Sequence, residues 1–319
     1  MALAIDVAGV SKLYGGERSP VGLRHLDMAV REGEVVALIG PNGAGKTTTV
    51  RGLATLLRFD GGSARVAGHD VSADPGRVRQ AIGLVGQSAA VDQHLSARQN
   101  LVFFGRLRGL RRPEAHARAA QLLEGLGLED AADKPALRLS GGMRRRLDVA
   151  VSLVVRPAVV FVDEPTTGLD PAARRDLWAR LRALVREGTT VLLTTQYLEE
   201  ADALADQVVL LAHGEVVARG TADELKRLVG PATVRMAFAS PADTSAAHDA
   251  LAGTVDGVQP DADGSSLTYP VRGSATSTEG VLRLAEAGIA PLEVEVRRPT
   301  LDDVFLTLTG SPATGRIPR

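Results

Sequence analysis

The sequence predicts an α/β fold with a largely parallel sheet, followed by a small α+β domain. Apolar runs alternate with helical patterns along the first two thirds of the chain, and one of these runs leads directly into a glycine-rich loop. The composition then shifts near Gly230-Pro231. With 319 residues, the chain is long enough for one large and one smaller domain. We expect domains over residues 1–230 and 231–319.

The elements of the first domain follow from its apolar pattern. Residues 3–10 alternate apolar and polar side chains, which predicts a half-buried strand. Short continuous apolar runs predict buried strands at 35–39, 82–85, 159–162, 191–194 and 208–211. A helix is expected from about residue 46. The segment from about 88 to 155 is rich in Leu, Ala and Arg, and predicts a helical insertion.

The second domain is expected to have the order βαββαβ. The predicted elements are strand 233–239, helix 242–252, strand 254–259, strand 265–271, helix 276–287 and strand 291–297. That order is typical of a ferredoxin-like unit. A short helix is expected to begin at Thr300, with Asp303 completing a capping box.

Composition narrows the classes of function. A net charge of −1 gives no reason to expect a nucleic-acid partner. The absence of cysteine excludes disulfides and thiolate metal sites. The N-terminus lacks the layout of a signal peptide, and the longest apolar run, Val149 to Val155, is too short to span a bilayer. We expect a chain that is soluble or peripheral to a membrane.

A phosphate-binding loop is the strongest motif. It has the pattern G-x-x-x-x-G-K-[ST] between a predicted strand and helix, and consists of Gly40, Pro41, Asn42, Gly43, Ala44, Gly45, Lys46 and Thr47, with Thr48 after it. The glycines allow the backbone to wrap phosphates, Lys46 can reach the β- and γ-phosphates, and Thr47 can coordinate Mg²⁺. The alternative is an ordinary turn that matches by chance. We expect ATP and Mg²⁺ as ligands.

Two acids end the predicted strand at 159–162. The carboxyl end of a central strand is where α/β sheets bind ligands. We expect Asp163 to hold Mg²⁺ and Glu164 to act as the general base toward the attacking water. The alternative is that both are solvated acids at the start of a turn before Pro165.

A second anion-binding segment lies between these motifs. Ser140, Gly141 and Gly142 precede a predicted helix, where unhindered backbone N–H groups and the positive end of the helix dipole favour a phosphate. The chain already has one phosphate loop, so this segment requires its own explanation.

The three motifs in this order resemble the nucleotide-binding subunit of an ABC transporter, a P-loop NTPase. The resemblance covers about residues 3–225 and rests on Gly40–Thr47, Leu139–Met143 and Val159–Pro165. It implies a head-to-tail homodimer in which each ATP lies between the phosphate loop of one copy and the Ser140–Gly142 segment of the other. Packing within the folded monomer is the competing explanation for the two glycines.

Further residues match the pattern of this family. Tyr14 resembles the aromatic residue that stacks on adenine, although a core or surface role is also open. Gln87 matches the glutamine that reaches Mg²⁺ and the attacking water. Gly168-Leu169-Asp170 matches the loop that links the two sites, while a simple helix N-terminus at Asp170-Pro171 is the alternative.

One position departs from the family pattern. Gln196 follows the strand at 191–194, where most members carry a histidine. Its amide can donate a hydrogen bond to the γ-phosphate but cannot carry a proton or a charge. Hydrolysis is therefore expected to depend on Glu164, assisted by Gln87 and Gln196, and to be slow. Met143, where Gln is more usual, lies outside the phosphate cradle.

The segments 139–148, 194–202 and 301–306 are similar to the daunorubicin-resistance ATP-binding subunits. This similarity extends over nearly the whole chain. It implies that two copies of this chain drive two copies of a separate membrane permease, which exports a hydrophobic drug or antibiotic, from the cytoplasmic side of the cell membrane. In that family the C-terminal segment supports assembly. Simple packing of Val304, Phe305 and Leu308 is the alternative.

Two other functions compete with export. A non-transport ATPase of translation or DNA repair usually has two nucleotide domains, a coiled coil or a zinc insertion, none of which this sequence shows. A protein that holds ATP and antibiotic in a closed dimer with little hydrolysis is compatible with Gln196. An export ATPase agrees best with the motifs.

Overall fold

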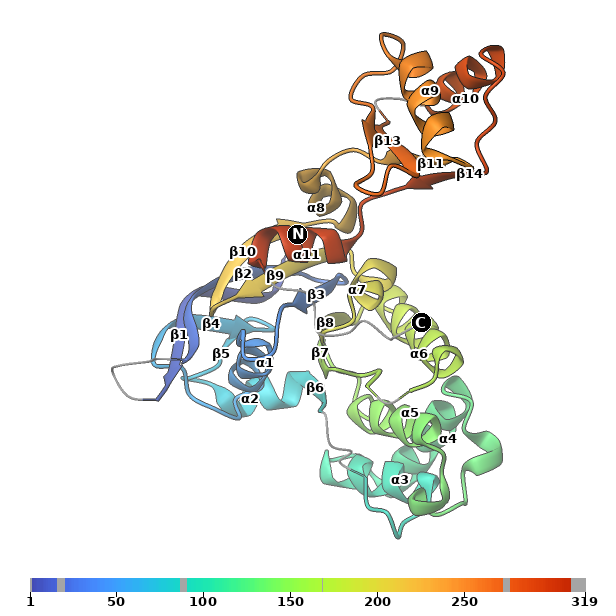
Figure 1. Cartoon of the computed structure of the whole chain (residues 1–319). Coiled ribbons are helices and arrows are strands. Elements are labelled where there is room, and N and C mark those ends of the chain that lie inside the picture. Colours follow the sequence, from blue (N-terminus) through green and yellow to red (C-terminus); the bar gives the residue numbers. More distant parts are fainter. Residues whose placement is uncertain (1, 16–20, 87–90, 168, 272–275, 311–319) are drawn as a thin grey trace. The chain divides into compact units, whose positions relative to one another are not determined.

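The chain forms two compact units (Figure 1). The computed structural model describes residues 2–15, 21–86, 91–167, 169–271 and 276–310. The first unit comprises Met1–Ala222 and Leu308–Arg319, and the second comprises Asp223–Thr307. Gln87 and Gly168, two residues singled out in the sequence, lie outside the described residues.

A ten-stranded sheet forms the centre of the first unit, in the order β5-β4-β1-β2-β10-β9-β3-β8-β7-β6. Its parallel half contains β6 (Ile82–Val85), β7 (Val159–Asp163), β8 (Thr190–Thr195), β3 (Val35–Ile39) and β9 (Gln207–Ala212). These are the strands that the continuous apolar runs predicted, so that prediction is confirmed.

The other half of the sheet differs from the expectation of a largely parallel sheet. It contains β1 (Leu3–Tyr14), β2 (Val21–Arg31), β4 (Gly61–Val66), β5 (His69–Asp70) and β10 (Glu215–Gly220). All of its pairs are antiparallel except the contact of β10 with β2. β4 and β10 carry glycine and charged residues, so they lack the apolar signal of a buried strand.

Helices complete the first unit, and α3, α4 and α5 form a group of their own (Figure 1). They are α1 (Lys46–Leu53), α2 (Pro75–Ala81), α3 (Ala97–Leu107), α4 (Arg112–Gly125), α5 (Gly141–Ser152), α6 (Pro171–Arg186) and α7 (Leu198–Leu204). α3, α4 and α5 lie between β6 and β7 in the chain, together with two 3₁₀ turns at Glu129–Ala131 and Ala136–Arg138. The described part of the expected insertion is therefore helical.

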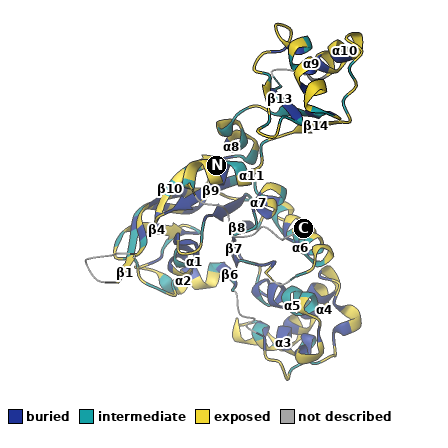
Figure 2. Ribbon diagram, viewed as in Figure 1, coloured by how far each residue is buried: buried dark blue, intermediate teal, exposed yellow. Residues whose placement is uncertain are grey.

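The parallel strands are buried on both faces (Figure 2). Along β7, Val160 and Val162 belong to one apolar cluster, which includes residues of α3 to α6, while Val159 and Phe161 belong to a second. This follows from the strand period of two, because successive side chains point to opposite faces. A strand held between two cores offers a rigid end on which to place functional groups.

The second unit begins within α8 (Ala222–Val229) and contains a four-stranded antiparallel sheet in the order β12-β13-β11-β14. The remaining elements, in chain order, are β11 (Thr233–Ala237), α9 (Pro241–Leu251), β12 (Gln259–Pro260), β13 (Ser266–Pro270), α10 (Thr276–Glu286), β14 (Glu293–Arg297) and α11 (Leu301–Thr309). Val234, Met236, Leu267 and Tyr269 lie in its core.

Two local predictions in this unit have opposite outcomes. The strand expected at 254–259 is wrong, since β12 begins only at Gln259. Gly253 and Gly257 have φ of 79° and 74°, and these left-handed turns interrupt the extended chain. The capping box at the start of α11 is confirmed: Asp303 N–H donates to Thr300 Oγ1 at 3.2 Å, and Thr300 N–H donates to Asp303 Oδ2 at 2.8 Å.

Among the described residues, no helix has the length and apolar character needed to cross a membrane.

Candidate active site at the carboxyl ends of the parallel strands

The phosphate loop joins β3 to α1 in a conformation that requires glycine. Gly40 has φ of 157°, and a Cβ placed there would lie 2.2 Å from the carbonyl oxygen of Leu211. Gly45 has φ of 111°, and its Cβ would lie 2.6 Å from Leu23. Gly43, with φ of 82°, is exposed. The loop is therefore a fixed backbone cradle, and the alternative of a chance turn does not explain its geometry.

Lys46 points its amine back into the loop. Its side chain is buried, and Nζ donates hydrogen bonds to the carbonyl oxygens of Gly40 at 2.7 Å and Pro41 at 3.2 Å. Burial lowers the pKa of Lys46, while the carboxylates of Glu164 and Asp163 act in the opposite direction. A cation thus lies near both acids that end β7.

Asp163 is at the centre of a small polar cluster. Its side chain is 5% exposed, and Oδ1 accepts hydrogen bonds from the hydroxyls of Thr47, at 3.4 Å, and Thr194. One carboxylate with one hydroxyl suits Mg²⁺, which takes few protein ligands and keeps several waters. The described residues contain no group of three or more His, Cys, Asp and Glu that could hold a metal ion.

Glu164 has a strained backbone. Its φ is +48°, a left-handed conformation that costs a non-glycine residue about 1–3 kcal/mol. Its N–H donates to the carbonyl oxygen of Thr194 at 3.0 Å, and Thr194 Oγ1 lies 3.3 Å from the same nitrogen. The chain therefore turns sharply at the end of β7, and strain of this kind gathers at functional sites.

Gln196 lies at the same edge of the sheet. It follows β8, which pairs in parallel with both β7 and β3, and it is half-buried. The next residue, Tyr197, is held by a hydrogen bond from its N–H to Thr195 Oγ1 at 3.0 Å, and the guanidinium of Arg174 lies 4.7 Å from its ring centre. The three predicted segments that end β3, β7 and β8 thus meet at one edge.

The Ser140–Gly142 segment is exposed at the start of α5. Ser140 is the N-cap, and its hydroxyl accepts a hydrogen bond from Met143 N–H at 3.2 Å. A Cβ on Gly141 would meet nothing within 4 Å, and a Cβ on Gly142 would meet only Ala173 at an ordinary 3.4 Å. Packing within one subunit therefore does not explain either glycine.

The remaining predicted residues are more isolated. Tyr14, at the end of β1, is 45% exposed, with Lys12 Nζ 5.8 Å from its ring centre. Asp170 is the N-cap of α6, where its carboxylate accepts a hydrogen bond from Ala173 N–H at 2.8 Å. Within one chain, Asp170 thus has the geometry of a simple helix N-terminus. Gln87 and Gly168 are outside the described residues.

Two residues near the site were missed from the sequence. Thr194 joins Asp163 to the backbone of Glu164, and its signal was a hydroxyl at the end of an apolar strand. Arg145, in α5, donates to backbone oxygens on both sides of Glu164. It stood within the run Arg144-Arg145-Arg146, which gives no indication of which arginine turns inward.

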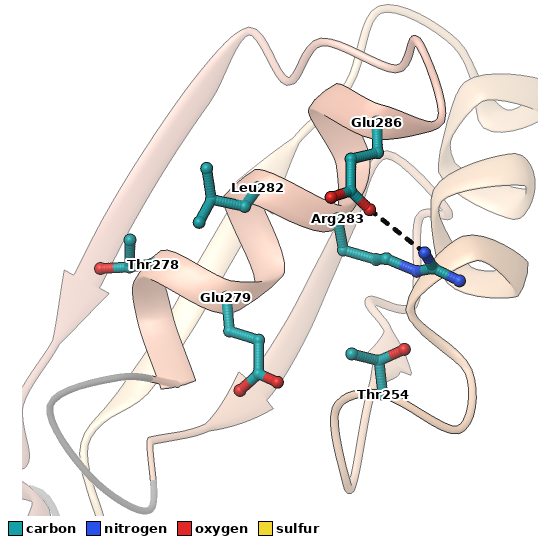
Figure 3. A pocket seen from close by; sticks show the side chains of 6 residues that line it. All are labelled: Thr254, Thr278, Glu279, Leu282, Arg283 and Glu286. Atoms are coloured by element: carbon teal, nitrogen blue, oxygen red, sulfur yellow. Dashed lines mark hydrogen bonds and ion pairs between the residues drawn. The ribbon is translucent and has the colours of Figure 1, made fainter.

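The second unit has a hollow of different character (Figure 3). Its volume is about 790 Å³, and its lining residues are all exposed: Thr254, Thr278, Glu279, Leu282, Arg283 and Glu286. Arg283 and Glu286 form an ion pair at 3.2 Å. The lining thus offers a ligand no buried polar group, in contrast to Lys46 and Asp163.

Comparison with known proteins identifies the family. A model of the ABC transporter family matches residues 23–167. The chain is 51% identical to the daunorubicin resistance ATP-binding protein DrrA3 of Streptomyces coeruleorubidus over 96% of both chains. It is 47% identical to the daunorubicin/doxorubicin resistance ATP-binding protein DrrA of Streptomyces peucetius, over 98% of this chain and 94% of that protein.

A solved structure agrees with this assignment. The dimeric bacterial ABC transporter cassette MJ0796 matches with a TM-score of 0.62 and 25% identity, covering 68% of this chain and 98% of that one. The phosphate loop, the acidic end of β7 and the Ser140–Gly142 segment all lie within the residues that the family model matches. The chain belongs to the ATP-binding subunits of ABC transporters, in the group of the daunorubicin and doxorubicin resistance proteins, and is an ATPase.

Proposed function

We propose that this chain binds Mg-ATP at the edge formed by β3, β7 and β8, and hydrolyses it there to drive efflux of a hydrophobic drug or antibiotic through a separate membrane permease. The observation that carries the proposal is the convergence of Lys46, Asp163 and Glu164 at one end of the parallel sheet. Catalysis of phosphoryl transfer depends mainly on positioning and electrostatics, and this edge supplies both.

The phosphate loop holds the nucleotide. Backbone N–H groups of the Gly40–Thr48 loop, in which only Pro41 has none, surround the phosphates, and Lys46 neutralises charge on the β- and γ-phosphates. Thr47 and Asp163, already close to each other, would hold Mg²⁺, with Gln87 as a third ligand. When bound, the metal would supply positive charge against the charge that develops on the phosphate oxygens. Tyr14 stacks on the adenine through its exposed ring.

Glu164 is the general base. It accepts a proton from the attacking water as that water bonds to the γ-phosphorus, and the bond from phosphorus to the bridging oxygen of ADP breaks. Gln196, at the end of the neighbouring strand, donates an amide hydrogen bond to the γ-phosphate, and Gln87 orients the water. Without an ionisable group at position 196, the rate depends mainly on Glu164.

Two copies of the chain close over two ATP molecules. Ser140, Gly141 and Gly142 of one copy contact the γ-phosphate held by the other, and Asp170 lies in the loop that crosses between the sites. The open surroundings of Gly141 and Gly142 support this arrangement, because the fold of one subunit has no need of glycine there. The related cassette whose structure is described as dimeric supports it as well.

The predicted second domain, residues 231–319, is an accessory domain for assembly. Its element order and its strand order β12-β13-β11-β14 support a ferredoxin-like fold. The relatives with daunorubicin resistance in their names match over nearly the whole chain, including this unit. The chain therefore acts as a peripheral subunit on the cytoplasmic side of the membrane, bound to a permease encoded separately.

Hydrolysis is tested with three forms of the purified chain. Wild type turns over ATP only with Mg²⁺, Lys46→Ala fails to bind a fluorescent ATP analogue, and Glu164→Gln binds it while turnover falls about 100-fold or more. An active Glu164→Gln variant would contradict the assignment of the base. Nucleotide binding without turnover in wild type would favour a binding protein over an export ATPase.

Export is tested in cells that express the chain with a candidate six-helix permease. Cells with the wild-type pair are expected to accumulate less daunorubicin than cells with the Glu164→Gln pair, and the chain should co-purify with the permease from solubilised membranes. Equal accumulation in both strains, with active ATPase in vitro, would exclude this drug as the substrate.

A further inference from the structure

Three consecutive arginines follow the Ser140–Gly142 segment, and each donates hydrogen bonds to a different part of the first unit. Arg144 reaches the carbonyl oxygen of Leu137 at 3.2 Å. Arg146 reaches those of Leu126 and Gly127, both at 3.0 Å, at the end of α4. These acceptors lie in the 3₁₀ turn at Ala136–Arg138 and in the residues just after α4, not in β7. Arg145 is different.

Arg145 extends from the second turn of α5 to the end of β7. Its Nε donates to the carbonyl oxygen of Pro165 at 2.8 Å, and its Nη2 donates to those of Asp163 at 3.2 Å and Glu164 at 3.3 Å. Its Nη1 donates to the carbonyl oxygen of Gly86, which follows β6. One guanidinium thus binds three consecutive peptide groups, with Glu164 in the middle.

The side chain of Arg145 is fixed in this position by burial and by an acid of its own helix. Its side chain is 12% exposed, and Nη1 also lies 3.4 Å from Asp148, one turn along the same helix. A planar guanidinium with five donors can satisfy several carbonyl oxygens in a fixed geometry, whereas an ammonium of the same charge cannot. These contacts therefore depend on the donor geometry of the guanidinium and not merely on its positive charge.

Glu164 is the residue that most needs such support. Its left-handed backbone, with φ of +48°, persists only when the surroundings hold it in place. Thr194 holds its N–H from the side of β8, and Arg145 holds its carbonyl oxygen from the side of α5. The direction in which the carboxylate leaves the chain depends on both.

We propose that Arg145 is a positioning residue that sets the orientation of the Glu164 carboxylate toward the attacking water. The proposal rests on the role of Glu164 as the base. It also gives α5 two tasks: its first residues face the nucleotide of the partner copy, and its second turn fixes the base of its own copy. Closure of the dimer and orientation of the catalytic base then both depend on this one helix.

The test compares Arg145→Lys with Arg146→Lys as a matched control from the same arginine run. For Arg145→Lys we expect kcat to fall about 10- to 100-fold, with KM for ATP and affinity for a fluorescent ATP analogue within about threefold of wild type. For Arg146→Lys, kcat stays within about twofold. The proposal would be overturned if the two variants had equal kcat, or if Arg145→Lys raised KM for ATP and left kcat unchanged.

A double-mutant cycle separates positioning from general damage. If Arg145 acts through Glu164, Arg145→Lys lowers kcat in wild type but changes little in the Glu164→Gln background. If kcat of the double variant fell by the product of the two single-variant factors, the proposal would be overturned. Should the lysine variant fail to fold, Arg145→Gln enters the same cycle, with the same outcomes deciding.

The cycle also separates this inference from the proposed function. If Glu164→Gln keeps wild-type turnover, the proposed base is wrong and the positioning role falls with it. If Glu164→Gln is inactive while Arg145→Lys is fully active, Glu164 remains the base and only the role of Arg145 is wrong.

Discussion

At the scale of single residues, the site combines a strained acid with an unusual neighbour. Glu164 has a positive φ that its type rarely adopts, and Gln196 departs from the histidine that the family resemblance led us to expect. The residue types and their order along the chain were predictable. The left-handed turn at Glu164 was not, because it results from hydrogen bonds to Thr194 and Arg145, which lie far from it in sequence.

The strain at Glu164 predicts a difference in stability between two inactive variants. Glycine adopts a positive φ freely, whereas alanine keeps the strain. Both Glu164→Gly and Glu164→Ala remove the carboxylate and should lose about 100-fold or more of the ATPase rate. In urea denaturation, we expect the glycine variant to be more stable than the alanine variant by about 1 kcal/mol. Equal or reversed stabilities would show that the backbone at this position relaxes without cost.

Gln196→His is expected to leave the ATPase rate unchanged or to raise it by up to about fivefold. A charge-assisted hydrogen bond to the γ-phosphate is stronger by about 1 kcal/mol than one from a neutral amide. Gln196→Leu, which has no donor, should lower the rate by a similar factor. The measurement is steady-state phosphate release at saturating ATP. Complete loss of activity in the histidine variant would mean that the amide itself is required.

At the scale of elements, the rigid strand ends explain how the site is placed. The parallel strands were predictable because they are buried on both faces, which requires continuous apolar runs. β4 and β10 were not, because their residues belong to an antiparallel half whose exposed positions carry charge and glycine. Beyond β8, α7 places the buried carboxylate of Glu200 between Thr166 and Trp178.

Glu200 gives the fold a predictable dependence on pH. Burial raises the pKa of Glu200 above its usual 4.5, although hydrogen bonds from Thr195, Trp178 and Thr166 oppose the shift. The folded protein therefore keeps this proton to higher pH than the unfolded chain does. Its contribution to stability is full below pH 4.5 and is lost as pH rises through the folded pKa.

Glu200→Gln should remove the loss of stability at higher pH, because the amide keeps an acceptor for Trp178 and never ionises. We expect the free energy of unfolding of the variant, relative to wild type, to increase through the titration range and then level off. Each unit of raised pKa corresponds to about 1.4 kcal/mol. Urea denaturation at a series of pH values measures the difference. A pH-independent difference would indicate that Glu200 stays in one protonation state.

At the scale of the whole molecule, the proposed function gives each chain two halves of different nucleotide sites. The phosphate loop, Asp163 and Glu164 form one half, and the exposed Ser140–Gly142 segment forms the other. The order of the motifs in the sequence already indicated this division. What the sequence could not provide is the surroundings of Gly141, since only the fold reveals that no neighbouring atom requires a glycine there.

This division predicts that Gly141→Leu separates folding from assembly. The Glu164→Gln protein should form a dimer in ATP, because nucleotide is bound but not hydrolysed. Adding Gly141→Leu should return it to a monomer by size-exclusion chromatography, since a side chain would fill the space meant for the γ-phosphate. Because nothing lies within 4 Å of that Cβ in the monomer, Tm should change by no more than about 3 °C.

Gly76→Leu is the matched control for this experiment. Gly76 lies in the first turn of α2, is exposed, and would likewise place a Cβ with nothing within 4 Å of it. In the Glu164→Gln background it should leave the ATP-dependent dimer intact. A dimer that persists with Gly141→Leu would place the Ser140–Gly142 segment outside the interface. A fall in Tm confined to Gly141→Leu would instead assign the glycine to folding, so the two outcomes distinguish a shared nucleotide site from packing within one chain.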